Sequence, residues 1–99
     1  MRGMMFRDSL AEDRGMLFLY AGPALHQNYM YQVRIPLDVL WLDLDHRVVE
    51  MIPNIPPCPS TSAKACPTYG GHQPSAYMLE LPAGTAAKFR VQLGDRIKF

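Results

Sequence analysis

The stretch from Val39 to Ile52 decides the fold, and it reads VLWLDLDHRVVEMI. Two apolar runs flank a polar connection around Asp45-His46, which is the pattern of an antiparallel β-hairpin. A two-residue turn at Asp45-His46 sets the register, because strand side chains alternate between the two faces. One face is then wholly apolar and predicts core: Leu40 opposite Met51, and Leu42 opposite Val49.

The other face of this hairpin is mixed in character. Its apolar members are Val39, Trp41, Val48 and Ile52, and its charged members are Asp43 and Glu50. Trp41 is predicted to lie directly across from Glu50, within reach of a cross-strand contact. This face is too apolar to be fully solvated and too charged to be core. We therefore expect it to be half covered, and it is the place to look for function.

Further strands are predicted before and after the hairpin. They are Met16–Tyr20, which Ala21-Gly22-Pro23 is expected to break, then Asn28–Val33, Ala76–Leu81 and a closing strand Arg96–Phe99. Two short helices are expected, one from the capping box Ser9–Glu12 and one over Gly84–Arg90 with Thr85 as N-cap. The stretch Pro53–Pro74 has no periodicity, so it predicts a long loop. With 99 residues, the chain fits one mainly β domain spanning residues 1–99.

Composition and charge disfavour two classes of partner. The net charge is +1 and the ten Lys and Arg residues are scattered, whereas nucleic-acid binding needs a basic patch. The longest apolar stretch, Met16–Ala21, has six residues, against the roughly 20 that a membrane-spanning helix requires. The first residues lack the long apolar core and small-residue cleavage site of a signal peptide.

The two cysteines, Cys58 and Cys66, lie eight positions apart between prolines. This spacing is not the C-x-x-C of a zinc or redox motif. A disulfide, two free thiols and metal ligation all stay open. A disulfide closes a nine-residue loop, worth about 2.5 kcal/mol on the chain-entropy estimate, and it indicates an oxidising compartment.

The carboxylates around the hairpin are the candidates for acid–base chemistry. Asp43 and Asp45 leave a strand for a turn, where acidic residues are favoured for conformational reasons. Asp38 is expected either to accept backbone N–H groups at the bend after Pro36 or to face a ligand. Glu50 beside Trp41 forms either half of a sugar or cation site, or a rim glutamate that covers the tryptophan edge.

Metal, cofactor and nucleophile motifs are not apparent in the sequence. His26, His46 and His72 lie far apart, without the pairing of a metal-binding helix. A copper site built from methionines is a weaker interpretation than core filling, because Met16, Met51 and Met78 fall inside predicted strands. Gly70-Gly71 lacks the spacing of a phosphate loop. We predict no cofactor and no metal.

Four stretches together resemble a known family. Residues 2–7 (RGMMFR) and 15–18 (GMLF) resemble the opening R-G-L-M-x-R…G-M-L-F of the bacterial and archaeal domain-of-unknown-function family 192. His26–Asp38 resembles that family's H-x-F-W-M-K-N-T-x-I-P-L-D segment, and Val39–Glu50 its following hairpin. Residues 77–84 and Gly94-Asp95 resemble its closing V-L-E-L-x-A-G…G-D.

The resemblance implies a mainly β fold, either a small antiparallel barrel or a jelly-roll-like sandwich with two short helices. It also implies an extracytoplasmic location, which supports the disulfide, but it implies no reaction. The family's Lys and Thr stand here as Tyr31 and Val33, so a polar site of the relatives would be altered. Relatives carry a strand before the R-G-L-M segment that is lacking here, which predicts a homodimer through an unpaired sheet edge.

These observations lead to three hypotheses of function. The first is a non-catalytic extracytoplasmic module that binds a sugar-like molecule or a protein segment; its ligand-binding residues would be Tyr29, Tyr31, Asp38, Trp41 and Glu50. The second is a small hydrolase-like or metal-assisted enzyme that uses Asp38 with Asp43 or Glu50. The third is a purely structural assembly subunit, which predicts no pocket.

Overall fold

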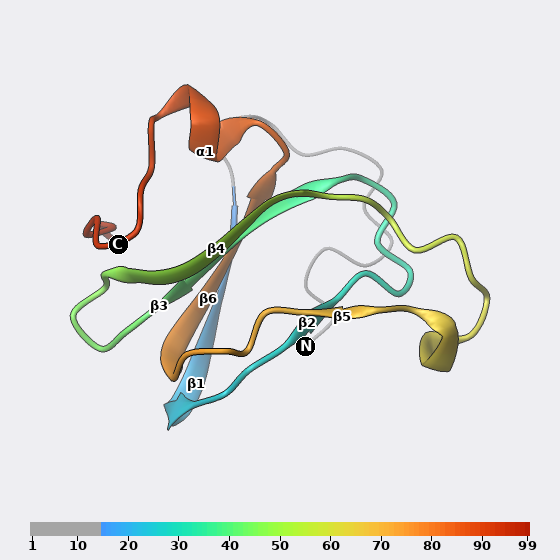
Figure 1. The fold of residues 1–99 in the computed structure, drawn as a ribbon, viewed down its shortest axis with the longest axis horizontal. Helices are drawn as coiled ribbons and strands as arrows, with labels where there is room; N and C mark the ends of the chain where they lie inside the picture. The colour runs from blue at the N-terminus through green and yellow to red at the C-terminus, as the bar shows by residue number, and fades with distance from the viewer. Residues whose placement is uncertain (1–14) are drawn as a thin grey trace.

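A central strand buried on both faces organises the molecule. The structure is a computed structural model and describes residues 15–99. All six residues of β3 (Leu37–Leu42) are buried. They contribute apolar side chains to both faces of a four-stranded antiparallel sheet, whose order is β1-β6-β3-β4 (Figure 1). The other strands are β1 (Met16–Ala24), β4 (Val48–Ile55) and β6 (Ser75–Pro82).

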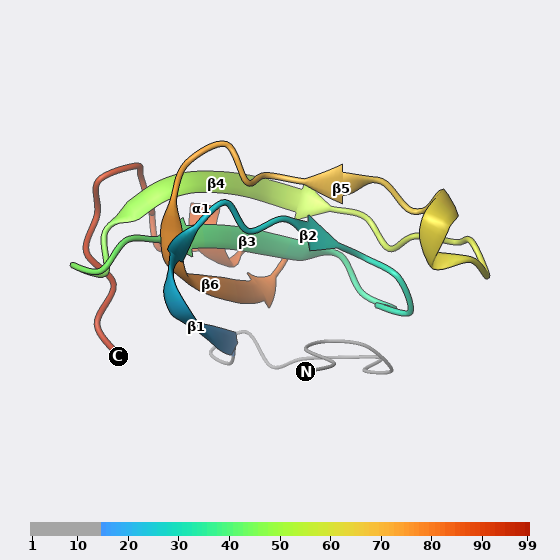
Figure 2. The same cartoon turned by 90° about the horizontal axis from the view of Figure 1, so that it is seen from below.

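One face of this sheet is covered by a two-stranded ribbon. The ribbon pairs β2 (Asn28–Tyr29) with β5 (Thr68–Tyr69) in antiparallel register. In Figures 1 and 2 it lies beside β3 and β4, on the side away from α1. Trp41 and Met78 project from the sheet into this layer, where they meet Met30 and Val33 from the segment after β2. This layer is the larger of the two apolar cores.

The opposite face carries the second core. There Leu40, Leu42 and Val48 pack with Ala86 of the one-turn helix α1 (Thr85–Lys88), which is drawn above the sheet in Figure 1. Val91 and Ile97 of the segment after α1 pack against the same cluster. The second face is therefore covered by a short helix and irregular chain rather than by another sheet.

The predicted hairpin is confirmed, with one shift in register. Leu40 faces Met51 and Trp41 faces Glu50 as expected, but Leu42 faces Val48, because a bulge interrupts the ladder between Trp41 and Leu42. The cause lies in the turn, which is longer than predicted: Asp43 N–H donates to Arg47 O at 2.9 Å, and His46 adopts a φ of 66°. Consequently Val48 occupies the core face that was predicted for Val49.

Of the remaining predictions about strands and helices, some are confirmed and others are wrong. Mainly β, antiparallel architecture is confirmed, as is the strand Ala76–Leu81 within β6. The predicted break at Gly22-Pro23 is wrong, because β1 continues to Ala24 through a shift in register. Of the predicted strand Asn28–Val33 only β2 forms, and Arg96 makes an isolated bridge to Arg47 in place of a closing strand. The N-cap of α1 is Gly84 rather than Thr85.

Two predictions concern residues outside the range that the structure describes. The helix from Ser9–Glu12 lies outside residues 15–99, and so does the segment at residues 2–7 before which the homodimer hypothesis places a missing strand. Within the described strands the sheet is open and does not close into a barrel. No helix in this part of the chain is long and apolar enough to cross a membrane.

The long loop predicted over Pro53–Pro74 is tied down at several points. Cys58 and Cys66 form a disulfide, with Cα atoms 5.7 Å apart. A 3-10 turn over Ala63–Ala65 lies between them, and β5 then pairs with β2. The disulfide resolves the three alternatives left open by the cysteine spacing.

Candidate functional site

Asp38 lies on the face of β3 that α1 covers, and it is almost fully buried. Its Oδ1 accepts the Asn54 N–H at 2.8 Å and its Oδ2 accepts the Ala86 N–H at 2.9 Å. A carboxylate in this position satisfies two backbone donors, one at the end of β4 and one in the first turn of α1. It therefore ties the central strand to two other elements, and both of its oxygens are engaged in doing so.

Trp41 lies on the opposite face of β3 and is fully buried. Its Nε1 donates to the His26 carbonyl at 2.7 Å, and the Gly70 backbone packs against the six-membered part of the indole. The hairpin face that was expected to be half covered is fully covered at this residue. The reason is that the β2–β5 ribbon folds over it, a contact between segments remote in sequence.

Glu50, the cross-strand neighbour of Trp41, lies at the rim of that cover. Its side chain is 13% exposed and accepts from both the backbone and the ring of His72: the Oε1 to backbone N distance is 3.0 Å and the Oε2 to Nδ1 distance is 2.6 Å. Partial burial acts to raise the pKa of Glu50, but the contacts with His72 and the backbone N–H of Gln73 outweigh it. The pKa of Glu50 is therefore below its ordinary value.

This pKa shift predicts a pH-dependent stability that the Glu50→Gln variant lacks. A carboxylate with a depressed pKa in the folded state stabilises the protein above its unfolded-state pKa, and this stabilisation is lost as the pH falls through the folded-state value. We expect the difference in unfolding free energy between wild type and Glu50→Gln to be present near pH 6 and to shrink as the pH falls below about 4. Urea unfolding at several pH values measures it.

The control for this experiment is His72→Ala, which removes a side chain that is 77% exposed. Because the ring contact helps to lower the pKa of Glu50, the variant should move the loss of stability toward higher pH. A difference between wild type and Glu50→Gln that stays the same from pH 7 to pH 3 would contradict the assignment.

Tyr29 and Tyr31 lie where the chain leaves β2. Their rings are nearly parallel, 4° apart in plane, with centroids separated by 6.4 Å. Tyr29 is exposed and Tyr31 is half-buried. The pair presents aromatic surface to solvent, unlike Trp41.

The five residues predicted to bind a ligand therefore do not form one surface. Asp38 and Trp41 are buried in different layers, Glu50 is bound by His72, and the two tyrosines lie elsewhere, Tyr29 exposed and Tyr31 half-buried. Asp43, the other carboxylate of the enzyme hypothesis, accepts the backbone N–H groups of Asp45 and Arg47 at 2.9 Å each. Within residues 15–99, no three His, Cys, Asp or Glu side chains gather as metal ligands would.

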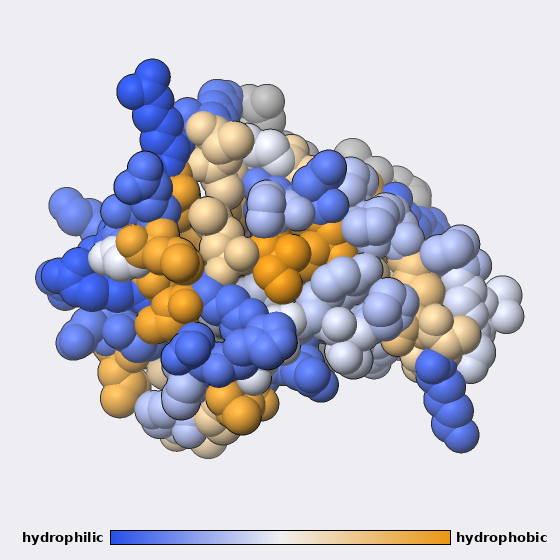
Figure 3. Space-filling model, in the orientation of Figure 1, coloured by the Kyte–Doolittle hydropathy of each residue, from blue (hydrophilic) through white to orange (hydrophobic). Residues whose placement is uncertain are grey.

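A concave feature on the α1 side of the sheet is one that the sequence did not reveal. A groove of about 420 Å³ lies between the sheet and the segment from α1 to the C-terminal residues. We call it the α1 groove. It is lined by Leu40, Leu79, Leu81, Thr85, Phe89, Val91, Ile97 and Lys98. The space-filling view shows apolar residues gathered below α1 and beside the C-terminal segment, with hydrophilic residues around them (Figure 3).

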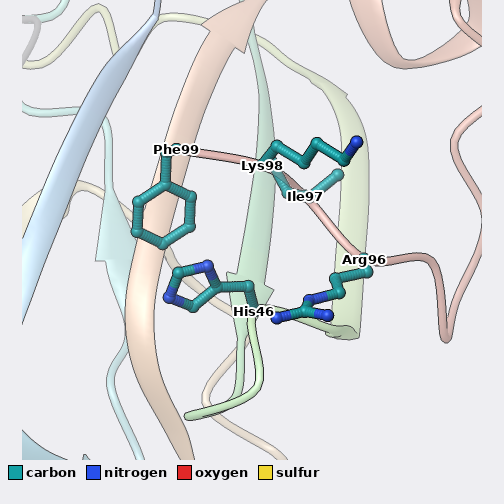
Figure 4. Close-up of a pocket in the computed structure, with 5 residues that line it drawn as sticks. All are labelled: His46, Arg96, Ile97, Lys98 and Phe99. Atoms are coloured by element: carbon teal, nitrogen blue, oxygen red, sulfur yellow. The ribbon is translucent and has the colours of Figure 1, made fainter.

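A second, smaller hollow of about 300 Å³ adjoins the α1 groove and shares Ile97 and Lys98 with it. Its other lining residues are His46, Arg96 and Phe99. The rings of His46 and Phe99 stack with centroids 3.8 Å apart, and Figure 4 shows them on one side of the hollow. In the same view Lys98 extends away from these rings, and the Arg96 side chain is directed toward them.

A signal for the α1 groove exists in the sequence but is weak. Leu79 and Leu81 alternate along a predicted strand, which indicates a buried face without saying what covers it. The covering segment has a single helical turn and no periodicity, so its position could not be derived. The groove is made where irregular chain covers a regular sheet incompletely.

Solved structures of similar chains share this fold. One is a protein of unknown function from Novosphingobium aromaticivorans, 31% identical, with a TM-score of 0.83; the match covers 99% of this chain and 66% of that one. Another, from Sinorhizobium meliloti, is described as a proposed transcription regulator. It is 32% identical, with a TM-score of 0.84, and the match covers 98% of this chain and 70% of that one.

A match to a protein family covers the whole length. The sequence profile of domain-of-unknown-function family 192, described as Uncharacterized ACR, matches residues 1–99. No curated protein matches the chain. The family match agrees with the motif resemblance and with the structural likeness to chains about 30% identical. The chain therefore belongs to domain-of-unknown-function family 192.

Proposed function

We propose that this protein is a non-catalytic, extracytoplasmic binding module whose ligand site is the α1 groove. The observation that carries the proposal is the groove itself. Six of its eight lining side chains are apolar, and its volume of about 420 Å³ falls within the range of small-molecule sites, roughly 300–1,000 Å³. Such a lining suits a small ligand with an apolar body. The disulfide between Cys58 and Cys66 supports an oxidising compartment.

The non-catalytic part of the proposal is supported by the state of the carboxylates. An acid–base pair requires two groups that converge on one cleft and remain available to a substrate. Asp38 accepts a backbone N–H group with each of its carboxylate oxygens, Asp43 accepts two with Oδ1, and Glu50 is engaged by His72. None of the three lines the α1 groove.

A second candidate is supported by the tyrosine pair. The parallel rings of Tyr29, which is exposed, and Tyr31, which is half-buried, can stack against a sugar ring or an extended peptide. This site lies at the end of β2, in the ribbon that covers the other face of the sheet and in the residues that follow it. It is therefore separable from the α1 groove by mutation.

A fluorescent probe tests the proposed function. N-phenyl-1-naphthylamine is uncharged and becomes bright in apolar sites, so we expect saturable fluorescence enhancement with the full chain. Phe89→Ser should weaken binding about tenfold, because a groove-lining aromatic side chain is lost. Leu44→Ser is the matched control: Leu44 is 64% exposed at the hairpin turn, whereas Phe89 is 62% exposed in the groove.

Three outcomes decide between the candidates. Loss of binding in Phe89→Ser but not in Leu44→Ser supports the α1 groove. Loss in a Tyr29→Ala, Tyr31→Ala double variant, with Phe89→Ser unaffected, overturns the groove in favour of the tyrosine site. Absence of saturable binding to the wild-type chain contradicts the proposed function and favours a structural subunit.

A further inference from the structure

We propose that the α1 groove accepts an anionic amphiphile, in which an aliphatic chain occupies the apolar lining and a carboxylate pairs with Lys98. This inference rests on the proposed function and adds the chemical class of the ligand. Among the groove-lining residues within the described range 15–99, Lys98 is the sole charged one. A ligand with one negative group and an apolar body therefore complements the whole lining.

Lys98 can contribute to the site in two ways, with its aliphatic stem and with its charged ammonium group. Lysine can lay its aliphatic stem along apolar surface and keep its ammonium group in water. Here the exposed residue borders the leucine-lined groove as well as the neighbouring hollow, so its stem can cover apolar wall while its ammonium group reaches a bound ligand. The hydroxyl-bearing residue Thr85 lines the same groove and offers a second polar contact.

The charges at the rim of the groove favour an anion, because the Asp38 carboxylate on this face of the sheet is buried and accepts two backbone N–H groups. The covering segment from Lys88 to Phe99 carries four basic residues and one acidic residue, Asp95, in a chain whose overall net charge is only +1. Asp95 is occupied, because its Oδ2 accepts the Gln92 N–H at 2.8 Å. Arg96 lines the adjoining hollow, which Lys98 also borders. A cationic ligand would meet repulsion from Lys98, whereas an anionic one gains from it and from Arg96 in the adjoining hollow.

The low polarity of the groove lining strengthens the preference for an anionic ligand over a neutral one. A charge pair beside an apolar surface is screened less than one in open water. A neutral chain of the same length buries the same apolar area but makes no ion pair with Lys98. The structure thus predicts discrimination by head group among ligands whose chains are equal.

Competition with the uncharged probe tests the head group. Decanoate, decanol and decylammonium are titrated against the N-phenyl-1-naphthylamine complex at pH 7.5, each below its critical micelle concentration. We expect decanoate to bind about two- to fivefold more tightly than decanol, and decylammonium to bind least tightly. In Lys98→Met, the affinity for decanoate should fall to that for decanol, while the affinity for decanol stays within about twofold.

The control is Lys64→Met, which makes the same change in charge and side-chain shape on an exposed residue of the 3-10 turn. It should leave all three affinities unaltered, and urea unfolding checks that both variants are folded. Equal binding of decanoate and decanol to the wild type, or a preference that survives in Lys98→Met, overturns the head-group assignment while the groove still binds. Failure of the probe and of all three ligands contradicts the proposed function itself.

Discussion

Replacing Asp38 by alanine is expected to lower the free energy of unfolding by about 3–5 kcal/mol, a large part of the stability of a domain this small. Both carboxylate oxygens accept backbone N–H groups, from Asn54 at the end of β4 and from Ala86 in α1. Truncation leaves these two donors without their acceptor in an almost fully buried position. A hydrogen bond to a charged group contributes about 1.5–3 kcal/mol, and two are lost together.

The series is completed by two further variants. Asp38→Asn retains one carbonyl acceptor and places an NH₂ group against the other donor, so an intermediate loss of about 2–3 kcal/mol is expected. Asp45→Ala changes an exposed carboxylate in the hairpin turn and should stay within about 0.5 kcal/mol of wild type. Urea unfolding followed by circular dichroism measures all three. An Asp38→Ala variant that loses less than Asp38→Asn would contradict this role.

The fold could be predicted from the sequence where apolar and polar residues alternate over several positions. The pairing of Trp41 with Glu50 followed from two apolar runs and a polar turn, and the observed register retains it. The exchange of Val48 and Val49 was not predictable, because it depends on a turn in which His46 adopts positive φ. One additional residue in a turn shifts the register of the next strand by one position, and this moves its side chains to the other face of the sheet.

The candidate site could be predicted less well, for a different physical reason. Trp41 looked half covered because its cover comes from β2 and β5, which have two residues each and therefore no period to detect. The α1 groove unites Leu40, Leu79 and Ile97, which are far apart in the chain. Their meeting depends on how an irregular segment crosses the sheet, and hydrophobic periodicity carries no information about such a crossing.

Gly70 gives the second large effect, because its position tests whether the β5 segment is essential to the cover over Trp41. A Cβ atom at Gly70 would lie 2.2 Å from Cζ2 and 2.4 Å from Cη2 of Trp41, and the residue has a φ of 72°. Gly70→Ala is therefore expected to cost about 2–5 kcal/mol, through overpacking and through strain in the left-handed region. Urea unfolding measures the loss, and near-ultraviolet circular dichroism reports whether the indole has moved.

Gly94→Ala separates the two causes. Gly94 has a φ of 89°, but a Cβ atom there would meet nothing within 4 Å, so this variant should lose only the conformational part, about 1–2 kcal/mol. The excess loss in Gly70→Ala measures the clash with Trp41. Gly70→Ala should cost less in a Trp41→Phe background than it does in wild type, because the indole atoms nearest to the new methyl group are removed. Equal losses in the two glycine variants would show that the β5 segment can move away, and that the tryptophan face is more open than the packing indicates.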